Sequence, residues 1–87
     1  MGIWIRSQDK EILAECNVLK LKYTSVNNIF YIYADSKGEK VYLGGYSTKE
    51  KALKVLDMIE THLEELEYKI HDREVVFKMP HDNEVIE

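Results

Sequence analysis

Alternating hydrophobic and polar positions at the start of the chain predict short β-strands. In the segment Ile3–Arg6, the two isoleucines share one side, while Trp4 and Arg6 share the other, because successive side chains of a strand point to opposite faces. Residues 13–23 continue the alternation but change phase near Asn17, which predicts a bulge or a break at that point. We therefore expect extended chain with one irregularity over this region.

The middle of the chain is predicted to form two more strands joined by a tight turn. Residues 29–34 are mostly β-branched or aromatic, which is typical of a central strand. A turn is predicted at residues 35–38, with Gly38 where a positive φ is tolerated, and residues 41–46 form the next strand. Because the connections are short, these strands should pair in an antiparallel meander.

One long amphipathic helix is predicted from Ser47 to about Tyr68. Ser47 and Glu50 have the spacing of a capping box. Apolar positions then recur every three or four residues, as on one helix face; they are Ala52, Val55, Leu56, Ile59, Leu63 and Leu66. Leu53 and Met58 fall outside this stripe, and we expect them to flank the core or to contact a partner subunit.

The end of the chain is predicted to add one more strand and a tail. Residues 71–73 read as a connector, residues 75–79 alternate as a strand, and Pro80 stops that strand. Residues 81–87 are expected to be a mobile acidic tail. The predicted fold is therefore α+β: a single domain at residues 1–80, with an antiparallel sheet of four to five strands and one long helix packed on one face.

Composition and charge narrow the classes of function. A chain of 87 residues is the size of one domain, and its formal net charge of -4 argues against a nucleic-acid polymer as the partner. Cys16 is the single cysteine and fits a small core residue in a protein of the reducing cytoplasm. No signal peptide and no apolar stretch of about 20 residues is evident, so we expect no membrane association.

The start of the helix is the first candidate site. Its lysines lie in the N-terminal half and its acids in the C-terminal half, which opposes the helix macrodipole. Free backbone N–H groups and a pair of glycines would suit a bound anion, although a capped helix with solvated lysines also explains the pattern. The candidate residues are Gly44, Gly45, Tyr46, Ser47, Thr48 and Lys49.

The second candidate lies on the first strand and the turn after it. Trp4 could stack on a base and Arg6 could bind a phosphate, with Ser7 and Gln8 as further polar contacts. In the alternative, Trp4 caps the core and Arg6 covers it through a cation–π contact. Tyrosines are also abundant: by parity Tyr31 shares a face with Tyr33, and Tyr42 with Tyr46. They would form cross-strand packing or the aromatic wall of a pocket or interface.

Catalytic motifs are lacking. The three histidines have no metal-ligand spacing with one another or with Cys16, and neither a P-loop nor a nucleophile elbow occurs. We therefore expect a protein that is not an enzyme and that uses no metal or cofactor.

Three segments of the chain also carry a resemblance. They are Trp4-Ile5-Arg6-Ser7-Gln8-Asp9-Lys10, Leu43-Gly44-x-Tyr46-Ser47-Thr48-x-Glu50-x-Ala52-Leu53-x-Val55-Leu56, and Val76-Phe77-x-Met79-Pro80. In outline they resemble a family of short, uncharacterised phage and prophage proteins of Gram-positive bacteria. That resemblance implies a counter-defence role in the host cytoplasm, such as sequestering the cyclic ADP-ribose isomers of Thoeris defence or the cyclic oligonucleotides of CBASS.

Two functions are compatible with these observations. The first is a non-enzymatic protein that sequesters a small nucleotide-derived immune signal, with Trp4 against the base and Arg6, Lys49 and the N–H groups near Gly45 around phosphate. The second is an inhibitor or adaptor that binds a host protein through the acidic surface of residues 60–67. In either case we expect a homodimer or higher homo-oligomer, because apolar surface is left over.

Overall fold

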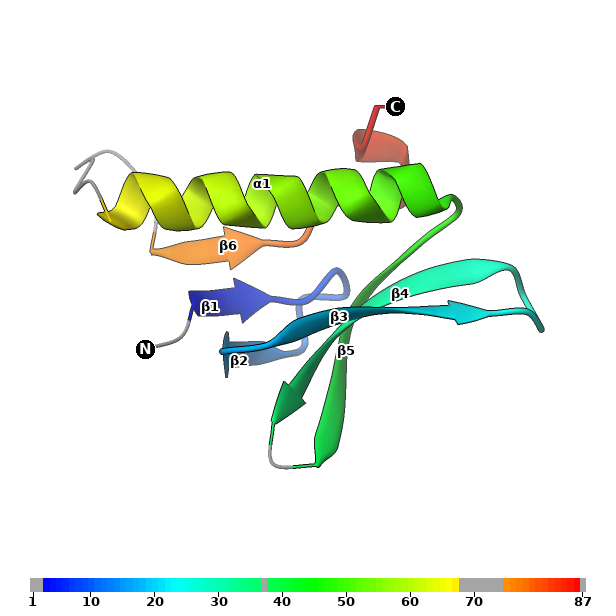
Figure 1. The fold of residues 1–87 in the computed structure, drawn as a ribbon, viewed down its shortest axis with the longest axis horizontal. Coiled ribbons are helices and arrows are strands. Elements are labelled where there is room, and N and C mark those ends of the chain that lie inside the picture. The colour runs from blue at the N-terminus through cyan, green and yellow to red at the C-terminus, as the bar shows by residue number, and fades with distance from the viewer. Residues whose placement is uncertain (1–2, 37, 68–74, 87) are drawn as a thin grey trace.

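The computed structural model describes residues 3–36, 38–67 and 75–86, and its fold is α+β (Figure 1). The strands are β1 (Ile3–Arg6), β2 (Leu13–Cys16), β3 (Leu19–Thr24), β4 (Ile29–Ser36), β5 (Glu39–Tyr46) and β6 (Val76–Lys78). The helices are α1 (Lys49–Glu67) and the short 3-10 helix η1 (Asp82–Glu84). The strands form two sheets of three, in the orders β2-β1-β6 and β3-β4-β5.

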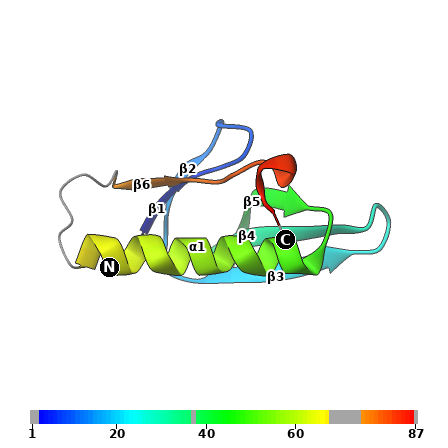
Figure 2. The same cartoon turned by 90° about the horizontal axis from the view of Figure 1, so that it is seen from above.

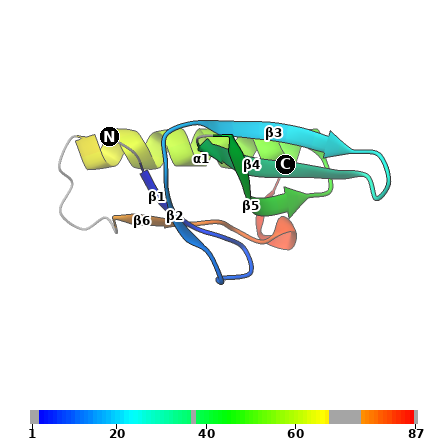
Figure 3. The same cartoon turned by 90° about the horizontal axis from the view of Figure 1, so that it is seen from below.

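The single antiparallel sheet predicted from the sequence is matched only roughly. Strands β3, β4 and β5 do form an antiparallel meander, and β1 pairs antiparallel with β2. The prediction misses the division into two sheets, and it misses that β6 lies parallel to β1. The irregularity expected near Asn17 is a break: β2 ends at Cys16, β3 begins at Leu19, and the chain passes there from one sheet to the other (Figure 3).

The turn between β4 and β5 agrees with its sequence. Gly38 has a φ of +84°, a conformation that costs a residue without a Cβ little. Residue 37 lies outside the described part of the chain. The pairing of β4 with β5 contains a register shift between Ile32 and Tyr33. Ile32 lies opposite Gly44, whereas the next residue, Tyr33, lies opposite Tyr42, so that β5 has one extra residue at this point. This bulge changes which side chains of β5 point inward.

The core lies between α1 and the inner faces of the two sheets. It is formed by Ile3, Ile5, Cys16, Ile32, Ala34, Leu43, Tyr46, Ala52, Val55, Ile59, Phe77, Met79 and Val85. As predicted, Ala52, Val55 and Ile59 of the helical stripe are buried. Leu56 is only partly buried, and the side chain of Leu66 lies outside the described part of the chain.

The prediction that the whole apolar stripe of the helix is buried is wrong at Leu63, which is 47% exposed. The helix has 19 residues and is about 28 Å long. Strands β1 and β6 have four and three residues, which span only roughly 10–13 Å. The C-terminal end of α1 therefore extends past β6 (Figure 1), and the described strands are too short to cover the whole length of its stripe. Leu53 and Met58, which lie outside the stripe, are exposed.

The segment that was expected to be a mobile acidic tail is folded against the domain. Residues 82–84 form η1, His81 N donates to Glu84 Oε1 at 2.8 Å, and Val85 is only 5% exposed. Figures 1 and 2 show this segment beside the N-terminal half of α1. It therefore belongs to the folded domain, and its place beside the start of the helix bears on the first candidate site.

Candidate functional site

The two candidate segments do meet in the structure, and Gln8 joins them. Its Nε2 donates to the carbonyl oxygens of Gly45 at 3.2 Å and Pro80 at 2.9 Å, while its Oε1 accepts from Gly45 N at 2.9 Å. The backbone N–H of Gln8 donates to Leu43 O at 2.8 Å. Because these contacts use both ends of the amide, Gln8 holds the first sheet to β5 and to the chain after β6.

Gly44 and Tyr46 beside Gln8 are buried, whereas Gly45 is partly buried against Ile29 and Tyr31 of β4. A Cβ on Gly45 would lie 2.8 Å from Ile29 Cγ2, and one on Gly44 would lie 3.0 Å from Gln8 Cδ. Tyr46 is completely buried, and its hydroxyl donates to Pro80 O at 2.8 Å. Burial raises the pKa of this hydroxyl well above its usual range. Gly44, against Gln8, and Tyr46, against Pro80, therefore show where the two sheets approach each other closely.

The anion-binding position predicted at the helix start is filled by the chain's own carboxylate. Asp82 Oδ1 accepts from Ser47 N at 2.8 Å, and Ser47 Oγ lies 3.0 Å from both carboxylate oxygens. Lys51 Nζ lies 3.4 Å from Asp82 Oδ2. The predicted capping box at Ser47 is wrong in its register: Thr48 Oγ1 accepts from Lys51 N at 3.1 Å, so Thr48 caps the helix. An external anion would have to displace Asp82.

We expect the contact between Asp82 and Ser47 to be sensitive to acid. The hydrogen bond from Ser47 N, followed by those from Ser47 Oγ and Lys51, lowers the pKa of Asp82. A carboxyl with a lowered folded-state pKa stabilises the fold above its unfolded pKa of about 3.9, and this contribution is lost as the pH falls through the folded value. Asp82→Asn should therefore destabilise the protein at pH 6–7, and the difference from wild type should shrink below about pH 4.

Urea denaturation of both proteins between pH 3 and pH 7 measures this difference. Asp57→Asn is the matched control, because it removes the same charge from an exposed helix position away from Ser47. A constant difference between wild type and Asp82→Asn across this pH range would contradict the assigned role of the carboxylate.

Trp4 and Arg6 lie apart from the helix start, on the outer face of the sheet β2-β1-β6. Their neighbours Ile3 and Ile5 are buried, whereas Trp4 is 41% exposed, so the predicted alternation is confirmed. Arg6 pairs in register with Lys78 of β6, and its Nη1 donates to Lys10 O at 3.1 Å. An exposed indole therefore shares one sheet face with two cationic side chains.

An open cavity of about 940 Å³ begins beside this face. Its lining includes Arg6, Lys10, Lys78 and His81, and Glu84 is the one carboxylate in it among the residues that the structure describes. Trp4 is outside the lining, two residues before Arg6 on the same strand face, or roughly 7 Å along the strand. The structure thus surrounds the cavity with several cationic groups and leaves an aromatic ring within reach of a ligand placed there.

Of the remaining candidate residues, one has a structural role in a turn and one is exposed to solvent. Ser7 is buried, and its Oγ bonds Asp9 Oδ1 and accepts from Ile12 N, so it shapes the turn after β1. Lys49 is exposed at the first position of α1. The sequence did not identify three further residues that line the cavity, namely Lys10, Lys78 and His81. Alternation in residues 75–79 does place Lys78 opposite the buried Phe77, but only the parallel pairing of β6 brings it beside Arg6.

Comparison with known proteins finds no family model, no curated protein sequence and no solved structure that matches this chain. Within residues 3–36, 38–67 and 75–86, no group of three or more His, Cys, Asp or Glu residues is placed to hold a metal ion. No helix in the described part of the chain is long and apolar enough to cross a membrane.

Proposed function

We propose that this protein binds and sequesters a small nucleotide-derived ligand, without catalysis, on the outer face of β2-β1-β6. One observation carries the proposal: the exposed Trp4 shares a strand face with Arg6, beside an open cavity lined by Lys10 and Lys78. The proposed site keeps the aromatic and cationic half of the sequence-based hypothesis. It moves the phosphate from the helix start, which Asp82 occupies, to the sheet.

The chemistry of the face suits a base joined to phosphate. An indole stacks on any nucleobase through its π-face, and a guanidinium can bind two phosphate oxygens at once. The hydrogen bond from Arg6 Nη1 to Lys10 O restrains the guanidinium beside the cavity, which lowers the entropy cost of binding. Lys10 and Lys78 supply further positive charge for a second phosphate. Cyclic ADP-ribose isomers and cyclic dinucleotides carry these groups together, in accord with the counter-defence role that the family resemblance implies.

Calorimetric titration with ADP-ribose isomers and cyclic dinucleotides tests the proposal. Trp4→Ala should cost about 1–3 kcal/mol of binding free energy if the ring stacks on a base, and Lys78→Gln should weaken binding in a salt-dependent manner. Lys54→Gln is the matched control, since it removes the same charge from α1 and should leave the affinity unchanged. Absence of heat with all of these ligands, from well-folded protein, would refute the proposal.

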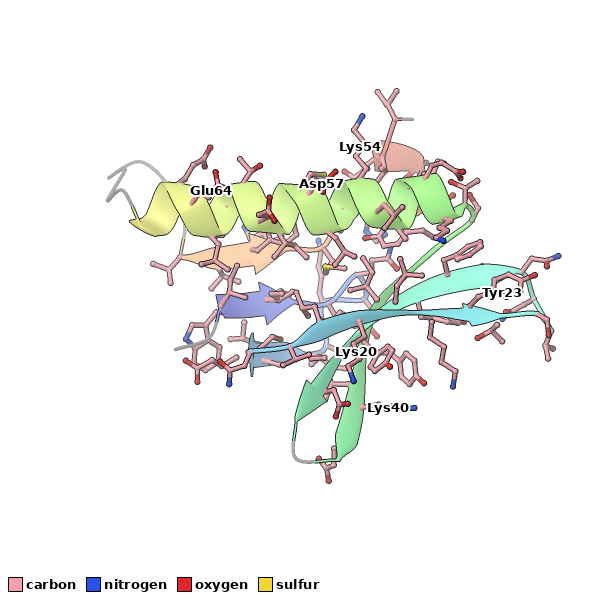
Figure 4. The ribbon with its side chains drawn as sticks, viewed as in Figure 1. Lys20, Tyr23, Lys40, Lys54, Asp57 and Glu64 are labelled. Carbon is pink, nitrogen blue, oxygen red and sulfur yellow. The ribbon has the colours of Figure 1, made fainter. Side chains whose placement is uncertain are left out.

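The acidic side of α1 favours a second candidate function. Asp57, Glu60 and Glu64 are exposed, and Figure 4 shows Asp57 and Glu64 pointing away from the sheets. Such a row of carboxylates can present a host protein with charges like those of nucleic acid. An inhibitor or adaptor of this kind would bind its host target through α1, so charge reversal at Glu60 and Glu64 would abolish capture while Trp4→Ala would not.

We also propose that the protein acts in the host cytoplasm as a homodimer or larger homo-oligomer. The support is the half-exposed Leu63 on the apolar stripe of α1, together with the exposed Leu53 and Met58. Light scattering at micromolar concentration should then give a mass at least twice the 10.3 kDa of one chain. Leu63→Glu should reduce that mass to one chain without loss of helix; a monomer mass for the wild type would contradict the proposal.

A further inference from the structure

The outer face of the second sheet, β3-β4-β5, carries tyrosines and lysines side by side. Register places Lys22 opposite Tyr31, and Lys20 opposite Tyr33. Tyr33 in turn faces Tyr42 of β5. Paired residues of adjacent strands share one face, so these side chains form a single surface, which we call the tyrosine-lysine face. It is made of Lys20, Lys22, Tyr31, Tyr33, Asp35, Lys40 and Tyr42, with Asp35 as its one acidic member.

The bulge in β5 produces this surface. By simple alternation Tyr42 and Tyr46 would share a face, but the register shift between Ile32 and Tyr33 reverses the parity. Tyr46 is therefore buried under α1, whereas Tyr42 is 41% exposed on the opposite side. The prediction that these two tyrosines share a face is wrong for this reason. The ring of Tyr42 is therefore partly exposed to solvent on the side of the sheet away from α1.

The three tyrosine rings support one another. The ring of Tyr42 lies 5.6 Å from the rings of both Tyr31 and Tyr33. Tyr33 is nearly buried at the base, with Lys40 Nζ 5.5 Å from its ring centroid. Such contacts restrict the rings, so Tyr42 and the partly exposed Tyr31 form a preorganised aromatic surface.

Glycine makes room beside these rings. Gly45 lies opposite Tyr31 in the register, and a Cβ there would come within 3.1 Å of Tyr31 Cε1. A shallow open cavity of about 220 Å³ lies at this point. Its lining consists of Tyr31, Tyr42, Leu43, Gly44 and Gly45, together with Gln8 and one carboxylate, Asp9. Because Gly44 and Gly45 carry no side chains, this cavity leaves the rings of Tyr31 and Tyr42 accessible to a flat ring.

Positive charge surrounds the rings although the whole chain is acidic. Lys20, Lys22 and Lys40 are exposed, Lys22 Nζ is 3.5 Å from Tyr42 Oη, and Lys20 is the partner of Asp35 at 3.3 Å. Figure 4 shows Lys20 and Lys40 on the far side of the sheet from Asp57 and Glu64 of α1. The net charge of -4 therefore does not exclude a local cluster of three lysines beside the rings, of which Lys20 is paired with Asp35.

We propose that the tyrosine-lysine face binds single-stranded nucleic acid. Exposed aromatic rings on an antiparallel sheet stack on unpaired bases without regard to sequence, and flanking lysines neutralise the backbone phosphates. Duplex is excluded as the occupant because its bases are stacked on one another and cannot reach Tyr42. The proposal reverses the expectation drawn from net charge, and it stands independently of the nucleotide site at Trp4, which lies on the other sheet.

Fluorescence anisotropy with labelled 12-nucleotide poly(dT) and poly(U) tests the proposal. At low salt both oligonucleotides should bind. If all three lysines contact phosphates, a plot of the logarithm of the binding constant against the logarithm of the salt concentration should have a slope of about −2. Tyr42→Ala should weaken binding roughly tenfold or more. Tyr42→Phe, which keeps the ring, should bind as wild type, and Lys22→Gln should lower the salt slope by about one unit or less.

Two controls make the outcome decisive. Lys54→Gln removes the same charge from α1 and should leave the anisotropy curve unchanged, and a blunt 12-base-pair duplex should bind much more weakly than the single strands. The proposal would be overturned by absence of binding at low salt, by equal binding of duplex, or by a folded Tyr42→Ala protein that binds as wild type. Trp4→Ala should have no effect here, so this experiment can fail or succeed separately from the test of the nucleotide site.

Discussion

Replacing Ile59 with alanine should lower the free energy of unfolding by about 2–5 kcal/mol, because the substitution leaves a cavity in a well-packed core. Ile59 is 3% exposed and lies in the cluster between α1 and the sheets. A domain of this size has little stability to spare, so part of the protein should be unfolded at 37 °C. Urea denaturation followed by circular dichroism measures the change.

Leu63 provides the matched control for Ile59. It belongs to the same apolar stripe by sequence, but its side chain is 47% exposed. In the monomer, Leu63→Ala should therefore cost less than about 1 kcal/mol, since almost half of the residue is already exposed. Equal losses for the two variants would mean that the C-terminal part of α1 is covered as well as its middle, contrary to the structure.

Gln8→Ala should cost about 2–4 kcal/mol, although Gln8 is a polar residue of a turn. The substitution removes three hydrogen bonds and leaves Gly45 N without its Gln8 acceptor, and an unsatisfied buried group is costly. Pro80 O keeps only its hydrogen bond from the Tyr46 hydroxyl. Gln8→Glu keeps the acceptor for Gly45 N but loses the donor, so it should be destabilised as well. Gln8→Asn has a side chain shorter by one methylene, so it tests whether the amide must extend far enough to contact both Gly45 and Pro80.

Thermal unfolding of these Gln8 variants decides between two roles for the residue. If Gln8 joins the layers, all three variants should unfold at lower temperature than wild type, with alanine among the least stable. If Gln8→Ala were as stable as wild type but had lost ligand binding, Gln8 would instead be a ligand contact, as the sequence suggested.

Local patterns in the sequence predicted the elements of this fold well. The alternation in Ile3–Arg6, the turn at Gly38 and the buried middle of α1 each depend on residues close together in the chain. The two-sheet arrangement was not predictable in this way, because the pairing of β6 with β1 joins residues more than 70 positions apart. The reversed parity of Tyr42 depends on one bulge, which alternation alone does not reveal.

The candidate site shows the same division between local and long-range information. The sequence suggested a ligand anion at the start of α1, because its lysines and free N–H groups are local features. It could not indicate that Asp82, 35 residues after Ser47, supplies the anion there from a segment expected to be mobile. Likewise, Trp4 and Arg6 were recognised on their strand, but Lys78 became their neighbour only through tertiary pairing.

A titration of ¹⁵N-labelled protein with ADP-ribose, followed by heteronuclear NMR, tests most directly where a nucleotide ligand binds. We predict chemical-shift changes at the Trp4 indole N–H and at the amides of Arg6 and Lys78. The amides of Gly45 and Ser47, which already donate to Gln8 and Asp82, should stay unchanged. Shifts concentrated at Gly45, Ser47 and Lys49, with Trp4 unaffected, would show that the ligand displaces Asp82 at the helix start and would contradict the site proposed on the sheet.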